Sequence, residues 1–127
     1  MAFSRDTTAS NIKPLRGAVI RKFTAGAVVA AGEVVHLETD GYVDPADCTS
    51  AADEAIGVAI QAAAAAGVGI DVVVLVPVKC LLEASPGGTV FTSTSAGEPS
   101  QTDSGNTTAV GYAESATVLF VLPEHLA

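Results

Sequence analysis

Residues 55–78, AIGVAIQAAAAAGVGIDVVVLVPV, form the longest apolar run of the chain and decide what kind of fold the sequence encodes. Three structures compete for this run: a membrane span, a soluble helix, and two strands joined by a turn. A membrane-spanning helix needs about 20 consecutive apolar residues. The uncharged part of the run ends at Ile70, just before Asp71, and it already contains Gln61 and three glycines. We therefore expect no membrane span.

The alanine-rich centre of the run, QAAAAAGVG at residues 61–69, has the local features of a helix. Ser50 and Asp53 resemble a capping box, alanine is the best helix former, and Gly67 fits the position that follows a last helical turn. Local propensity alone predicts a helix over residues 51–66.

The surrounding sequence occurs twice, and this repeat argues against a helix. GEVVHLETDGYVDPADCTSAADEAIGVA (residues 32–59) matches GTVFTSTSAGEPSQTDSGNTTAVGYA (residues 88–113) in its glycines, its polar loop and its closing Gly-Val-Ala or Gly-Tyr-Ala. The first copy then continues through QAAAAAGVG and the second through only ESA. A strand connection tolerates this difference, because doubling a loop costs only about 0.6 kcal/mol. We predict that QAAAAAGVG is a hairpin connection, with Gly67 and Gly69 at positive φ.

The same features predict the fold class. The 127 residues suffice for one compact domain, strand formers are common, and glycine and proline recur at short intervals. We predict an all-β fold: a small sandwich or barrel built from an internally duplicated strand-turn-strand unit (approximately 20–78 and 79–122), with an extended N-terminal arm outside a single β domain over residues 17–127. Because residues 70–76 are nearly all apolar, their strand should be covered on both faces. Strands are expected near 17–23, 26–29, 33–39, 55–60, 70–76, 78–83, 88–93, 108–113 and 116–122.

Charge is divided along the chain. Five of the six basic residues lie in the first 22 positions, which carry a net charge of +4, whereas residues 23–127 carry −12. We expect residues 1–16 to form a flexible basic arm that orders on a partner, the alternative being a solvated, disordered terminus. Nucleic acid is a poor partner, because an acidic body repels phosphate. The candidate partner-binding residues of the arm and first strand are Arg5, Lys13, Arg16, Arg21 and Lys22.

Few side chains have the pattern of a catalytic or metal site. His36, Glu38 and Asp40 alternate and would share one face of a strand, where they could hold a metal, although such a trio is more typical of a solvated strand face. The acidic loop at residues 44–54 lacks the spacing of a calcium-binding EF-hand loop. We predict no metal and no cofactor.

The sequence also lacks the motifs of common enzymes. It contains no nucleophile elbow, phosphate loop, dinucleotide fingerprint or zinc-protease motif, and His125 lies near the chain end, where fraying is usual. Residues 1–17 contain no apolar segment typical of a secretory signal, so we expect synthesis in a reducing cytosol. Cys48 and Cys80 allow one disulfide, but free thiols are expected there. The chain is not expected to be an enzyme.

Short motifs follow one another in a fixed order in the two repeats. The first repeat contains Ala-Gly-Ala-Val-Val (25–29), Gly-Glu-Val-Val (32–35), Ala-Ile-Gly-Val-Ala (55–59), the turn ending at Gly67, and Val72-Val73-Val74. The second contains Pro-Gly-Gly-Thr-Val-Phe (86–91), Ala-Gly-Glu-Pro (96–99) and Ala-Val-Gly-Tyr-Ala (109–113). In this order the motifs resemble the capsid cement proteins of tailed bacteriophages. The resemblance covers roughly residues 17–122, and Pro77 stands where that family usually has glycine.

The resemblance implies a structural protein of the virion. Such a protein is made in the host cytoplasm, docks on the outer surface of the head, often as a homotrimer, and reinforces contacts between major capsid protein subunits. It implies neither a catalytic site nor nucleic-acid or membrane binding. The alternative is a β-sandwich ligand- or glycan-binding module, for which the six aromatic residues provide little surface. A small hydrolase that depends on His36 is a further alternative.

Overall fold

The fold is all-β, as predicted, and its strands are antiparallel. The computed structural model describes residues 3–47, 54–102 and 108–122, and no α-helix occurs in these ranges. A single 3-10 turn, η1 (Ala9–Asn11), is the one helical element there. The strands are β1 (Ser4–Arg5), β2 (Lys13–Pro14), β3 (Val19–Thr24), β4 (Val34–Leu37), β5 (Val43–Pro45), β6 (Ala55–Ala59), β7 (Gly69–Lys79), β8 (Leu81–Leu82), β9 (Thr89–Thr92), β10 (Pro99–Ser100), β11 (Ala109–Ala113) and β12 (Val118–Val121).

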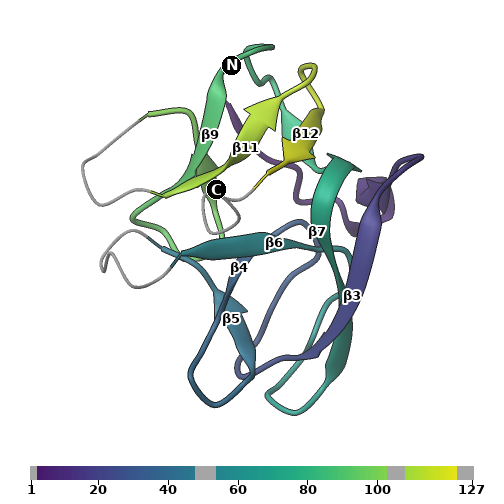
Figure 1. Cartoon of the computed structure of the whole chain (residues 1–127), viewed down its shortest axis with the longest axis vertical. Coiled ribbons are helices and arrows are strands. Elements are labelled where there is room, and N and C mark those ends of the chain that lie inside the picture. The colour runs from purple at the N-terminus through teal and green to yellow at the C-terminus, as the bar shows by residue number, and fades with distance from the viewer. Residues whose placement is uncertain (1–2, 48–53, 103–107, 123–127) are drawn as a thin grey trace.

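Strand pairing repeats in the same way as the sequence. The large sheet has the order β10-β9-β11-β12-β7-β6-β4-β5. Read outward from its centre, the first unit is β7-β6-β4-β5 and the second is β12-β11-β9-β10, and the two units join where β12 pairs with β7. Figure 1 shows them as the lower and upper halves of a strongly curled sheet. The duplicated unit is therefore a duplicated set of strand pairings.

The repeated Gly-Val-Ala or Gly-Tyr-Ala motif requires its glycine for the same structural reason in both units. A Cβ added to Gly57 in β6 would collide with the backbone carbonyl of Val73 in β7. A Cβ added to Gly111 in β11 would collide with the backbone carbonyl of Phe120 in β12. In each unit the glycine therefore permits two neighbouring strands to approach more closely than any side chain would allow.

The connection between β6 and β7 contains no helix in its described residues, 60–68, as the repeat predicted. It is held by the backbone of Ala63, which exchanges two hydrogen bonds with Val29, at 2.8 and 3.0 Å. Gly67 has the expected positive φ of 95°, but Gly69 does not, because it already begins β7. Of the helix that local propensity predicted over 51–66, residues 51–53 lie outside the described ranges.

Two predicted strand assignments are wrong. The expected strand at 26–29 is absent; only isolated bridges form, at Ala25 with Val43 and at Val29 with Ala63. The expected strands at 70–76 and 78–83 are instead one long strand, β7, which continues through Pro77, followed by the short β8. Proline is tolerated at this point because β7 changes partners there: β3 pairs with residues 69–75 and β12 with residues 76–79. Val76, at the change, has a φ of 60°, which is unusual for a β-branched residue.

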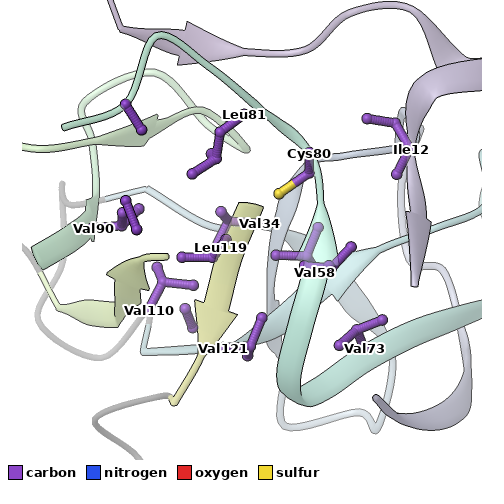
Figure 2. Packing of buried hydrophobic residues seen from close by; sticks show 14 of the residues in the cluster. Ile12, Val34, Val58, Val73, Cys80, Leu81, Val90, Val110, Leu119 and Val121 are labelled. Atoms are coloured by element: carbon purple, nitrogen blue, oxygen red, sulfur yellow. The ribbon is translucent and has the colours of Figure 1, made fainter. Parts of the chain in front are cut away.

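The buried apolar side chains of the described residues form two clusters on opposite faces of the central strands. Val34, Val58 and Val73 belong to the larger cluster, whereas their neighbours Val35 and Val72 belong to the smaller one. The central strands are thus covered on both faces, as predicted for residues 70–76. Figure 2 shows side chains of both units in the larger cluster, including Val34 and Val58 from the first and Val90, Val110 and Leu119 from the second.

The N-terminal segment packs against the β domain, so its placement outside the domain is wrong for the described residues 3–16. β1 pairs with β8, and β2 pairs with the end of β7. Ile12 is buried in the larger cluster, and the buried Asp6 carboxylate accepts hydrogen bonds from the backbone N–H of Thr8 and the side-chain amide of Asn11. Local charge suggested a free arm, but the apolar Ile12 provides burial energy that charge patterning does not reveal.

Among the described residues, no helix is long and apolar enough to cross a membrane.

Candidate functional site

Residues 13–24 run along one side of β7 and form the most distinctive surface of the molecule. β2 pairs Lys13 with Lys79, and β3 then runs antiparallel to β7 from Val19, opposite Leu75, to Thr24, opposite Gly69. In the described ranges, no strand pairs with the other side of β3. β3, the purple ribbon beside β7 in Figure 1, is therefore an open edge strand.

Four of the five predicted binding residues lie along this edge. Lys13 and Arg16 are exposed, and so are Arg21 and Lys22 in β3. Val19 and Ile20 are also exposed, at 43% and 41% of their surface. We refer to Lys13, Arg16, Arg21, Lys22 and the two apolar residues Val19 and Ile20 as the basic edge.

The Lys22 ammonium lies 3.5 Å from an Asp71 carboxylate oxygen across the β3–β7 pair. The Lys22 side chain is 68% exposed, so water screens this ion pair and leaves it weak. Lys22 can consequently exchange Asp71 for an acidic group of a partner at little cost.

Arg5 differs from the other four predicted residues, because its side chain is directed into the protein. Its Nε donates to a Glu98 carboxylate oxygen at 2.7 Å, and its Nη1 donates to the carbonyl of Ala31 at 3.2 Å. The Arg5 side chain is only 12% exposed. Because Ala31 belongs to the first repeat and Glu98 to the second, Arg5 connects the N-terminal segment to both, and we no longer count it among the partner contacts.

The electrostatic contrast between the basic edge and the rest of the chain is large. Residues 13–22 contain four basic and no acidic residues, whereas the remainder contains two basic and fourteen acidic residues. An acidic partner is attracted to the edge and repelled by the remaining surface, and this contrast favours one orientation of approach. At physiological ionic strength the effect extends only about 8 Å, so it acts at contact distances.

A second group of polar side chains lies on the β4–β5 hairpin. His36 is directly opposite Asp44 in the strand register, and Glu38 follows His36 on the same face. The His36 Nε2 lies 3.7 Å from a Glu38 carboxylate oxygen, and ligand atoms of all three residues lie within 4.8 Å of one another. The alternating sequence pattern correctly placed His36 and Glu38 together, but it grouped Asp40 with them where the structure places Asp44. Asp40 lies in the turn, where its carboxylate accepts a hydrogen bond from the backbone N–H of Tyr42.

Other predicted features carry no evident chemistry. Burial raises the pKa of the Cys80 thiol to about 12, with a further contribution from the nearby Asp6 carboxylate, so the thiol is unreactive in the folded state.

Tyr112 of β11 stacks on Phe120 of β12, with ring centroids 4.8 Å apart. These two aromatic rings contact each other across the strand pair. Cys48, Asp53 and His125 lie outside the described residues.

Comparison with known proteins adds no functional assignment: no family model matches the chain, and no curated protein is significantly similar to it.

Proposed function

We propose that this chain is a capsid cement protein that binds the outer surface of a tailed-phage head and stabilises contacts between major capsid protein subunits. The observation that supports the proposal is the basic edge: an open β-strand that presents both positive charge and apolar side chains on an otherwise acidic protein. The role is structural rather than catalytic, and its location is the virion.

The edge has the physical properties of a docking site for an extended segment. An open edge strand offers unpaired backbone N–H and C=O groups, to which a partner strand can add. Arg21 and Lys22 disfavour pairing between two copies of this basic strand, yet they attract a segment that contains carboxylates. Val19 and Ile20 supply apolar area that such a segment can bury.

A rigid β domain also suits repeated binding on a lattice. Each copy needs only modest affinity at one edge, because self-association into a homotrimer would link several contacts and raise the overall affinity. The proposal therefore includes trimer formation, which light scattering coupled to size-exclusion chromatography would measure.

The decisive experiment compares two double variants in co-sedimentation with undecorated heads of the cognate major capsid protein. Arg21→Gln/Lys22→Gln removes two charges from the basic edge, and Arg21→Lys/Lys22→Arg keeps them. These substitutions are preferable to deletion of residues 1–16, because that deletion would remove the buried Ile12 and Asp6. Both variants should fold, since the two side chains are exposed.

We expect the neutral variant to bind more weakly, with a shallower salt dependence, and the charge-conserving variant to bind like the original chain. Imaging of decorated heads should show density at fixed lattice positions, with β3 facing the shell. If the original chain leaves no density on the heads, the cement function is wrong. If the neutral variant binds as well as the original, the basic edge is not the contact surface.

A further inference from the structure

We infer that His36, Glu38 and Asp44 form a binding site for a divalent transition-metal ion, with Zn²⁺ as the expected ligand. This inference is independent of the proposed capsid function. It begins from the register of the β4–β5 hairpin, which places an imidazole directly opposite one carboxylate and beside another. The three ligand atoms come from two strands and lie within 4.8 Å of one another.

The second observation is an unsatisfied carboxylate oxygen on one of these three residues. The Oδ1 atom of Asp44 is buried and accepts no hydrogen bond. Gly26 covers this oxygen so closely that a Cβ at position 26 would collide with it, and the Gly26 backbone N–H is bonded to the Val43 carbonyl instead. Water therefore cannot reach the atom, and a buried carboxylate oxygen without a partner is costly.

Charge balance indicates what would compensate. Glu38 and Asp44 bring two carboxylates together, and like charges at such a separation repel. A divalent cation bound by one oxygen from each would neutralise both charges and relieve the desolvation of Asp44.

The donor set selects the class of metal. One imidazole nitrogen and two carboxylate oxygens suit zinc and related first-row ions better than calcium or magnesium, which prefer oxygen ligands alone. Zinc binds at about 2.0–2.2 Å from nitrogen and oxygen, so its ligand atoms stand roughly 3.4 Å apart. The His36–Glu38 separation of 3.7 Å is close to this value.

The site also has an entrance and a flexible ligand. The Glu38 side chain is 42% exposed, whereas that of His36 is only 7% exposed. A rotamer change of Glu38 can bring its carboxylate closer to the other two ligands, while His36 and Asp44 are fixed by the strand pairing. Three protein ligands leave a fourth position for water, and the ion would connect β4 to β5.

The test measures binding of Zn²⁺ alone to the metal-free full-length chain by titration calorimetry, together with the melting temperature with and without Zn²⁺. All proteins carry Cys48→Ser and His125→Asn, which remove the other histidine and a second thiol. Glu38→Gln and Asp44→Asn remove one ligand each. Asp40→Asn is the matched control, since it neutralises a nearby carboxylate while keeping the oxygen that accepts the Tyr42 N–H bond.

We expect one Zn²⁺ per chain, a higher melting temperature with Zn²⁺, and affinity at least about 100-fold lower for both ligand variants but unchanged for Asp40→Asn. Because Glu38 is partly exposed, Glu38→Gln should fold even if Asp44→Asn does not. The proposal is overturned if Zn²⁺ leaves the melting temperature unchanged, or if Glu38→Gln binds it as tightly as the parent. Loss of binding in Asp40→Asn would equally overturn it, because the turn and not the strand pair would then supply the ligands.

Discussion

Replacing the repeated glycine by alanine should destabilise both units, and Gly111→Ala at least as strongly as Gly57→Ala, because Gly111 also has a φ of 156°. In Gly57→Ala the new Cβ meets the Val73 carbonyl, and in Gly111→Ala it meets that of Phe120, in each case well inside contact distance. Each strand must therefore move by about 1 Å to restore ordinary van der Waals separation. Overpacking of this kind costs about 1–3 kcal/mol, and each weakened or lost hydrogen bond between the two strands adds about 0.5–1.5 kcal/mol. We expect a loss of about 2–5 kcal/mol, which corresponds to a fall in melting temperature of about 10 °C or more.

The assay is urea and thermal unfolding followed by circular dichroism, with Gly69→Ala as the matched control. A Cβ at position 69 meets only the flexible Lys22 side chain, at 3.8 Å, and Gly69 has no positive φ. Alanine there should change the unfolding free energy by less than about 1 kcal/mol, in the stabilising direction if the reduced entropy of the unfolded chain dominates. The close-approach argument is refuted if Gly57→Ala and Gly69→Ala unfold at the same urea concentration. If only Gly111→Ala is tolerated, the two units do not share this geometry.

Two further predictions concern the side chains of Arg5 and Cys80, which are turned into the protein. Arg5→Met keeps the apolar volume of the side chain but removes its hydrogen bonds to Glu98 and Ala31. It should lower the unfolding free energy, measured by urea titration, by about 1–3 kcal/mol. An unchanged urea midpoint would show that Arg5 does not stabilise the packing of the N-terminal segment. The Cys80 thiol has its pKa raised from 9.0 to about 12 by burial, so its contribution to stability is complete below about pH 9 and is lost as the pH rises towards 12, because the unfolded chain releases the proton first. The urea midpoint should therefore fall further between about pH 8 and about pH 10.5 for the original chain than for Cys80→Ala. An equal fall in the two proteins would contradict this assignment of the pKa shift.

The repeat made most of the fold predictable. It identified QAAAAAGVG as a connection although local propensity favoured a helix, because the second unit uses only ESA at the equivalent place. Apolar patterning also identified the main strands of both units. Pattern and repeat succeed here because burial on two faces imposes strong constraints on composition.

The elements that sequence could not reveal are short or contain proline. β5 ends in Pro45 and β10 begins with Pro99, and these strands close the two ends of the sheet, where proline is tolerated. Their residues have the composition of turns and give no strand signal. β7 was divided at Pro77 for the same reason, although its change of partner allows the strand to continue.

The candidate sites show a similar limit. Periodicity alone placed Asp40 with His36 and Glu38, but the hairpin turn occupies Asp40 and the opposite strand supplies Asp44. Cross-strand neighbours depend on register, and register depends on the turn. Likewise, charge patterning predicted that the basic side chains of the first 22 residues lie on the surface. This holds for Arg21 and Lys22 but not for Arg5, whose partner Glu98 is 93 residues away in sequence.

Comparison of the two units explains why β3 is open. In the second unit, the end of β7 occupies the position that β3 has in the first: β7 residues 76–79 pair with β12, just as β3 pairs with the beginning of β7. On its other side this end of β7 is covered by β2, through Lys13 and Pro14. The corresponding side of β3 has no such cover in the described chain. An extended segment of a partner added to β3 would therefore occupy the place that β2 occupies in the second unit. The pairing of β2 with the end of β7 is thus an example, within this chain, of the strand pairing proposed between β3 and its partner.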